Sequence, residues 1–101
     1  MIALYARVST AHQGQELETQ LLPLRDWVAA QGRDDFGIYT DYASGSNLDR
    51  PGWNRLSKAW RRGVIDTVAV LRLDRAFRSV VDMHSVMAEL EGRGIRFAVI
   101  T

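Results

Sequence analysis

Cysteine is absent from this chain of 101 residues. Its absence excludes a disulfide framework and any metal site built on thiolate ligands. The sequence also has no apolar run close to the roughly 20 residues that a membrane-spanning helix needs. No basic segment followed by an apolar one opens the chain, so nothing indicates a secretory signal. We therefore expect a cytoplasmic protein without a membrane partner.

Lysine is nearly absent as well. Lys58 is the only lysine among the 13 basic residues, and the others are all arginines. With 12 acidic residues the net charge is +1, which does not by itself indicate a nucleic-acid partner. Arginine is the better bidentate ligand for phosphate, so the bias is consistent with phosphate chemistry. A genome rich in G and C would produce the same bias, and composition leaves both explanations open.

Apolar residues divide the chain into alternating strands and helices. Near Glu16 their spacing becomes that of one helix face, and Gly32 is placed to end this helix. Pro51 suits the first turn of a second helix, which Gly63 would close. Residues 79–82 have the form of a capping box at the start of a third helix. The expected strands are 2–8, 36–40, 67–73 and 95–100.

The alternation of strands and helices predicts an α/β fold in a single domain. We expect a mostly parallel four-stranded sheet with helices on both faces. Ligands of such sheets gather at the carboxyl ends of the strands. Polar residues follow these ends: Arg7 and Ser9 after the first strand, Asp41 after the second, and Asp74 and Arg75 after the third. These residues should therefore meet at one edge of the sheet.

The end of the first strand has a pattern that suits anion chemistry. Tyr5, Arg7 and Ser9 share one face because side chains alternate along a strand. Two residues span roughly 6.6 Å, so the arginine can reach an anion held at the serine hydroxyl. An alternative is purely structural: Arg7 would pair with a carboxylate, and Ser9 or Thr10 would cap the following helix.

A second basic cluster follows the third strand. In "RLDRAFR" the carboxylate of Asp74 lies among Arg72, Arg75 and Arg78, while Leu73 is expected to face the core. One ion pair with Asp74 leaves the other arginines available for a phosphoryl group. Arg50, after a loop rich in Gly and Ser, is a further phosphate candidate, with a solvated loop arginine as the alternative.

Three sequence blocks together resemble a known family. "YARVST…Q", "DYASGSNLDRPG" and "RLDRAFRS", in this order, are similar to the catalytic domain of the serine recombinases, the resolvase and invertase family. The resemblance implies site-specific DNA recombination, in which a serine attacks a DNA phosphodiester and forms a 5′-phosphoserine intermediate. Strands are then exchanged and the reaction reverses. It implies no metal and no small-molecule cofactor, because the covalent bond retains the phosphodiester energy.

The resemblance also assigns roles to individual residues. Ser9 corresponds to the nucleophile, and Asp74 to an acidic residue that orients an arginine or assists the leaving hydroxyl. The register of the family glutamine is open between Gln13, which we favour, and Gln15. Asp41 is expected to be structural. The remaining matches are the catalytic arginines Arg7, Arg75 and Arg78, and the phosphate or DNA contacts Arg50, Ser44 and Arg72.

The family pattern continues beyond what these residues contain. We expect 1–101 to be a catalytic domain truncated before the long oligomerisation helix, with no DNA-binding domain. The implied partners are double-stranded DNA at a recombination site and, in the full-length protein, further copies in a dimer or tetramer. This chain alone is expected to be inactive.

Two other interpretations compete with an active recombinase. The first is an inactive remnant of the same fold that acts, if at all, as a protein-interaction or regulatory module. The second is a different doubly wound domain, such as a phospho-acceptor receiver, but that would need acidic residues after the first strand, where Arg7 and Ser9 stand. A dinucleotide-binding domain is disfavoured because no G-x-G-x-x-G follows that strand.

Overall fold

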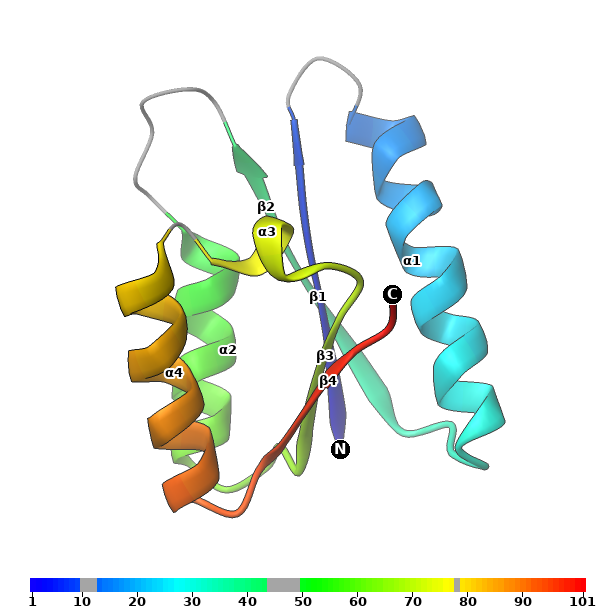
Figure 1. Ribbon diagram of the computed structural model, residues 1–101. Coiled ribbons are helices and arrows are strands. Elements are labelled where there is room, and N and C mark those ends of the chain that lie inside the picture. Colours follow the sequence, from blue (N-terminus) through cyan, green and yellow to red (C-terminus); the bar gives the residue numbers. More distant parts are fainter. Residues whose placement is uncertain (10–12, 44–49, 78) are drawn as a thin grey trace.

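Parallel strands form one sheet at the centre of the molecule. The computed structural model describes residues 1–9, 13–43, 50–77 and 79–101 (Figure 1). The strands are β1 (Ile2–Ser9), β2 (Phe36–Ala43), β3 (Thr67–Val70) and β4 (Arg96–Val99), and the helices are α1 (Gln13–Ala30), α2 (Pro51–Arg61), α3 (Leu73–Ala76) and α4 (Val80–Gly92). The order in the 4-stranded sheet is β2-β1-β3-β4, and every pairing is parallel. The predicted sheet is confirmed.

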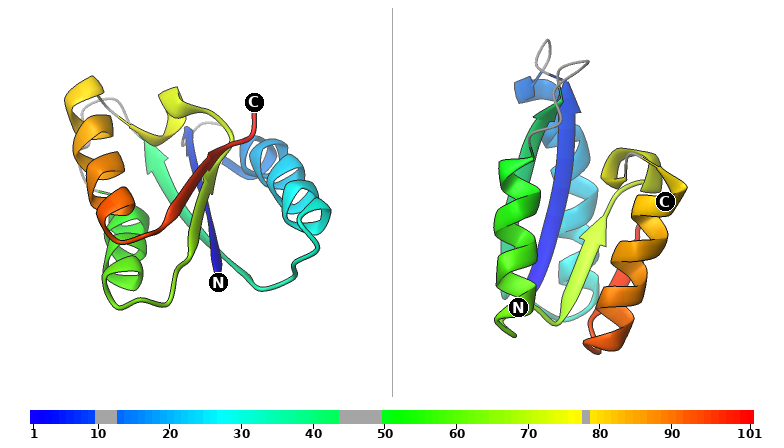
Figure 2. Two further views of the ribbon diagram at one scale, coloured as in Figure 1. Left: turned by 60° about the horizontal axis from the view of Figure 1, so that its bottom comes forward. Right: turned by 90° about the vertical axis from the view of Figure 1, so that its left-hand side faces the viewer.

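Helices cover both faces of this sheet, as the sequence predicts (Figure 2). One face packs against α1, where Leu24 and Val28 meet Leu4 of β1. The opposite face packs against α2 and α4, which contribute Leu56 and Leu90 to a second cluster. The two sets of β1 side chains alternate in sequence, because successive residues of a strand point to opposite faces. Tyr5 and the positions in phase with it therefore belong to the face that carries α2 and α4.

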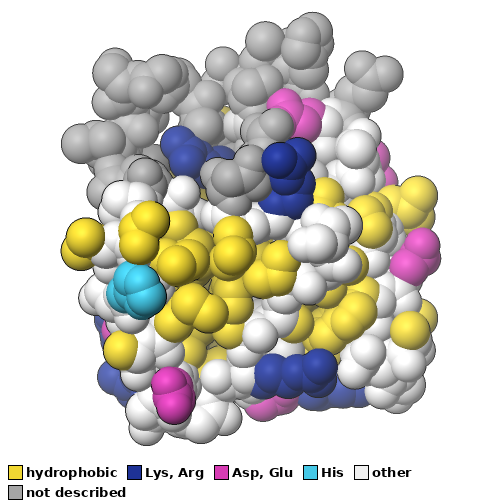
Figure 3. Space-filling view, in the orientation of Figure 1, with side chains coloured by type: hydrophobic (Ala, Val, Ile, Leu, Met, Phe, Trp, Pro, Cys, Tyr) yellow, Lys and Arg dark blue, Asp and Glu magenta, His cyan; other side chains and the backbone are white. Residues whose placement is uncertain are grey.

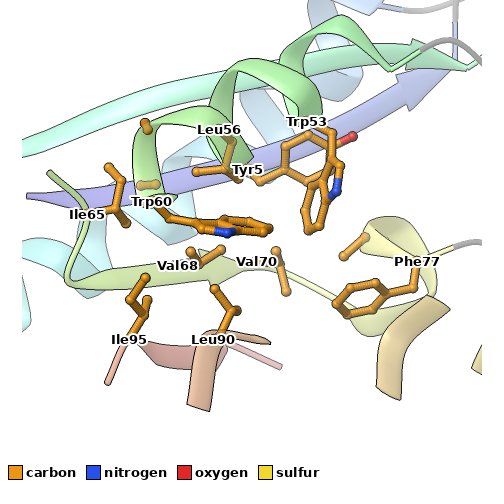
Figure 4. Close-up of a cluster of buried hydrophobic side chains, with 13 residues drawn as sticks. Tyr5, Trp53, Leu56, Trp60, Ile65, Val68, Val70, Phe77, Leu90 and Ile95 are labelled. Atoms are coloured by element: carbon orange, nitrogen blue, oxygen red, sulfur yellow. The ribbon is translucent and has the colours of Figure 1, made fainter. Parts of the chain in front are cut away.

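Aromatic side chains form the centre of the cluster beneath α2 and α4 (Figure 4). The ring of Trp53 makes edge-to-face contacts with Tyr5, Trp60 and Phe77, at centroid distances of 4.9, 5.6 and 5.8 Å. Edge-to-face packing stabilises aromatic pairs in addition to the stability gained from burying their apolar surface. It joins β1, α2 and the segment after α3, so the cluster fixes how these elements lie around the sheet edge.

Several predicted helix ends are confirmed. Gly32 and Gly63 follow α1 and α2 with φ of 73° and 81°, a left-handed conformation that glycine adopts at little cost. Pro51 stands in the first turn of α2. Ser79 caps α4, and its hydroxyl accepts a hydrogen bond of 3.0 Å from the backbone N–H of Asp82. The capping box expected at Thr10 lies outside the described residues.

The third strand is shorter than predicted. It ends at Val70, which pairs with Tyr5, although β1 itself continues to Ser9. The chain then leaves the sheet and forms the short helix α3 at Leu73–Ala76. The prediction that Leu73 faces the core is wrong, since this side chain is 39% exposed.

Hydrophobic side chains gather on the face that carries α4 and β4 (Figure 3). The large exposed ones are Val80, Val81 and Met87 of α4 and Val99 of β4. Other described residues do not cover this surface. No helix in the described ranges is both long and apolar enough to span a membrane.

Glu89 ties the carboxyl-terminal half of α4 to α2. Its carboxylate accepts hydrogen bonds from Trp60 Nε1 at 2.6 Å, Arg61 Nε at 2.9 Å and Arg93 Nε at 3.1 Å. These donors, Arg61 foremost, lower the pKa of Glu89 from 4.5 to about 2. Hydrogen bonds to the charged form stabilise it, so protonation of Glu89 should weaken the contact between the helices.

We predict that Glu89 contributes to an acid-dependent loss of stability. A carboxyl with a lowered pKa stabilises the fold above its unfolded value of 4.5, and the contribution disappears as the pH falls toward about 2. Glu89→Gln should cost about 1 kcal/mol at neutral pH, because the site is partly solvated. Urea unfolding across this pH range should show a shallower pH dependence in Glu89→Gln. The exposed Glu91→Gln on the same helix is the control, and an equal effect there would contradict the prediction.

Candidate active site

The backbone brings the polar strand ends to one edge of the sheet. Arg7 pairs in register with Asp41, and Ser9 with Ala43, so β1 and β2 end side by side. The helix α3, which carries Asp74 and Arg75, contacts β1. In Figure 1 it lies in front of the upper half of these strands, below their tips. The predicted convergence of the backbone at the carboxyl edge is therefore present.

Asp41 is a buried structural anchor at this edge. Its side chain is 2% exposed and accepts hydrogen bonds from Tyr5 Oη at 2.7 Å and from the backbone N–H groups of Gly52 at 2.7 Å and Trp53 at 2.9 Å. The last two are free N–H groups of the first turn of α2, so the carboxylate caps this helix. The interpretation of Asp41 as structural is confirmed. Burial, together with the bond to Asp41, raises the pKa of Tyr5 well above its usual value.

Arg50 immediately precedes α2, and its side chain is turned inward. It is only 8% exposed. Nη2 donates to Tyr5 Oη at 3.1 Å and to the carbonyl oxygen of Ala76 at 2.5 Å. The guanidinium also lies 4.6 Å from the centre of the Trp53 ring, within cation–π range. The alternative of a solvated loop arginine is therefore wrong.

Arg7 lies near the end of β1 and is partly exposed. Its backbone carbonyl accepts a hydrogen bond of 2.8 Å from Gln20 Nε2, and the side chain of Gln20 is buried against this strand. No described residue forms an ion pair or side-chain hydrogen bond with the Arg7 guanidinium. The alternative in which a carboxylate neutralises Arg7 thus finds no support within the described residues.

The other predicted site residues are located less completely. Arg72 is exposed and stands at the N-cap of α3. The backbones of Ser9, Gln13, Asp74 and Arg75 lie at the end of β1, the start of α1 and within α3, but their side chains are outside the described part. Ser44 and Arg78 lie outside the described residues.

Sequence reasoning missed three contributors to this edge. Tyr5 bridges Asp41 and Arg50, Gln20 holds the Arg7 carbonyl, and Asp82 of α4 lies 3.7 Å from Arg50 Nη1. The alternation of β1 placed Tyr5 on the face of Arg7, which was a usable signal. The sequence offered no comparable signal for Gln20 or Asp82, because both act across large separations in the chain.

Comparison with known proteins identifies the family. A family model described as "Resolvase, N terminal domain" matches residues 2–101. The chain belongs to the resolvase family. The resemblance found in the three sequence blocks is thereby confirmed, and this resolvase-family chain has the fold of a serine recombinase catalytic domain.

Relatives and solved structures agree with the assignment. The chain is 37% identical over 101 residues to the serine recombinase gin of Escherichia phage Mu, with 100% of this chain and 47% of gin covered. It is 37% identical over 91 residues to the transposon Tn3 resolvase of Escherichia coli, with 90% and 45% covered. This resolvase-family chain therefore spans about half the length of the curated relatives it matches.

Among solved structures, the N-terminal catalytic domain of TP901-1 integrase superposes with a TM-score of 0.85 at 32% identity, covering 98% of this chain and 76% of that one. A resolvase family site-specific recombinase from Streptococcus pneumoniae gives a TM-score of 0.85 at 25% identity, with 98% and 70% covered. The two matches extend over nearly all of the resolvase-family chain, so they support the whole sheet and its helices rather than one motif.

Proposed function

We propose that this chain is the catalytic part of a site-specific serine recombinase that cleaves and rejoins double-stranded DNA. The observation that carries the proposal is that β1 and β2 end side by side and that α3 contacts β1. That edge holds Ser9 beside an arginine whose charge no described residue neutralises. A hydroxyl next to fixed positive charge is what attack on a phosphodiester requires.

In the proposed reaction the Ser9 hydroxyl oxygen attacks the phosphorus of a DNA phosphodiester. The bond from phosphorus to the 3′ oxygen breaks, and the 3′ oxygen takes up a proton as the serine loses one. The products are a 5′-phosphoserine and a free 3′-hydroxyl, which attacks the phosphoserine of an exchanged strand in the reverse step. The phosphoester bond retains the energy, so no cofactor is consumed.

The remaining residues fit supporting roles. Arg7, Arg75 and Arg78 stabilise the charge that develops on the phosphoryl oxygens, as guanidinium groups match these oxygens in pairs. Asp74 orients an arginine or assists the leaving hydroxyl. Arg72 and Ser44 contact the phosphate backbone, as does Arg50 once its buried guanidinium is uncovered. The family pattern assigns Gln13, the first residue of α1, to the site as well.

We assign recognition of the DNA site to a part of the protein other than residues 1–101. The relatives are about twice as long as the aligned segment, and the net charge of +1 neutralises few phosphates. We infer that the complete protein binds its recombination site as a dimer or tetramer in the cytoplasm. Residues 1–101 alone should bind DNA poorly and should not recombine it.

A chimera tests the proposal directly. Residues 1–101 replace the matching half of gin, to which the whole chain aligns. With the DNA site of that recombinase carrying a nick to trap the intermediate, denaturing electrophoresis should show a covalent protein–DNA adduct. A chimera that folds and binds the site without forming an adduct would contradict the proposal.

A further inference from the structure

The Arg50 guanidinium is buried but its hydrogen bonding is incomplete. Within the described residues, Nε is buried without a hydrogen-bond partner, and Nη1 has Asp82 Oδ2 at 3.7 Å, beyond hydrogen-bond distance. That carboxylate oxygen is buried without a partner as well. The Asp82 side chain is 31% exposed, so the pair is partly solvated, but its buried atoms Arg50 Nε and Asp82 Oδ2 lack hydrogen bonds at some cost in stability.

The contacts that enclose Arg50 come from four elements. Tyr5 of β1, Trp53 of α2 and the Ala76 carbonyl of α3 hold one side of the guanidinium, and Asp82 of α4 is its facing anion. With 8% of the residue exposed, a DNA phosphate cannot reach the guanidinium in this arrangement. Any role of Arg50 in binding phosphate therefore requires that α3 or the start of α4 move away from α2.

Of the contacts around Arg50, the one with Asp82 should be the easiest to break. It lies in the first turn of α4, where Ser79 accepts its backbone N–H independently of the carboxylate. The carboxylate holds Arg50 by charge at 3.7 Å without a hydrogen bond. A phosphate oxygen within hydrogen-bond distance would be a stronger partner for the same cation.

We propose that Asp82 is a positioning residue that keeps Arg50 in a closed position, and that a phosphate takes its place when the site opens. The proposal rests on the function proposed above, in that the phosphate is that of the DNA. It differs from a permanent structural role, in which Arg50 would stay bound to the Ala76 carbonyl throughout.

Labelling with phenylglyoxal, an arginine reagent, tests the closed position without any need for recombination. Peptide mass spectrometry of the purified chain follows modification of Arg50, with exposed Arg62 as the internal reference. We expect Asp82→Asn to raise the Arg50 rate about three- to five-fold relative to Arg62, the factor that loss of a partly solvated charge pair gives. Glu91→Gln, which removes an exposed carboxylate at the other end of α4, is the matched control.

Three labelling results would contradict the proposed role of Asp82. An Arg50 rate unchanged by Asp82→Asn, or raised equally by Glu91→Gln, would overturn the proposal. So would faster labelling of Arg33, which is paired with Asp35 and Asp66 at the far end of the sheet, because it would show general unfolding. These results are independent of whether the chimera forms an adduct.

A second measurement tests displacement by phosphate. Inorganic phosphate should slow Arg50 labelling in Asp82→Asn at concentrations that leave the wild-type rate unchanged, because the wild type retains its own anion. Equal protection of both proteins, or of neither, would contradict competition between phosphate and Asp82.

Discussion

Replacing Ser9 with alanine in the chimera is expected to abolish the covalent protein–DNA adduct. If Ser9 is the nucleophile, the alanine variant lacks the oxygen that forms the phosphoester. The fold should hardly change, since the loss of one hydroxyl at the end of a strand typically costs under about 1 kcal/mol. Denaturing electrophoresis with the nicked site measures the adduct, and urea unfolding measures the stability.

Arg7→Ala is the companion variant, because it removes charge while keeping the nucleophile. Loss of one preorganised donor to a transition state typically lowers the rate about 10²- to 10³-fold, so a slow adduct should remain detectable.

The structural alternative makes the opposite prediction for Ser9. If Ser9 only caps α1, its alanine variant loses roughly 1 kcal/mol of stability and keeps its chemistry. An adduct that survives Ser9→Ala would eliminate this serine as the nucleophile.

The sheet and its helices were predictable because their signals are local. Runs of apolar residues with the right period gave β1 nearly to its end, and glycines marked where α1 and α2 stop. The second strand was predicted to end at Thr40, but β2 continues to Ala43. The sequence pattern was misleading where the end of a strand depends on tertiary contacts. The apolar pattern continues to Leu73, but β3 stops at Val70 and the chain leaves the sheet to form α3 at Leu73–Ala76.

The candidate site was predictable as a set of strand ends and not as a set of contacts. Parallel order alone places Arg7, Ser9 and Asp41 at one edge. The direction of a long side chain is a tertiary property: Arg50 meets Tyr5 across 45 positions of sequence. Its burial follows from the aromatic rings and the Ala76 carbonyl that surround it, and no periodicity encodes that.

The start of α2 packs closely on the end of β2, and a substitution at this contact should have a large effect on stability. The backbone of Gly52 lies so near β2 that a Cβ there would stand 2.1 Å from the carbonyl oxygen of Thr40 and 3.1 Å from Asp41 Oδ1. Both are parts of the site edge, and the first is backbone that cannot rotate aside. The approach lets the Gly52 N–H reach Asp41 at 2.7 Å, so the absence of a side chain and the cap of α2 are linked.

Gly52→Ala should therefore destabilise the chain by about 3 kcal/mol or more, at the upper end of overpacking effects, because the backbone of α2 must move off β2. Urea unfolding measures the change, and phenylglyoxal labelling of Arg50 should rise with it, since Arg50 directly precedes this turn. Gly92→Ala at the end of α4 is the matched control: its Cβ meets nothing within 4 Å. Alanine also favours helix over glycine, so this control should be neutral or gain up to about 1 kcal/mol. If the two variants unfold at the same urea concentration, α2 does not depend on close contact with β2 and the geometry argued for the Asp41 cap is wrong.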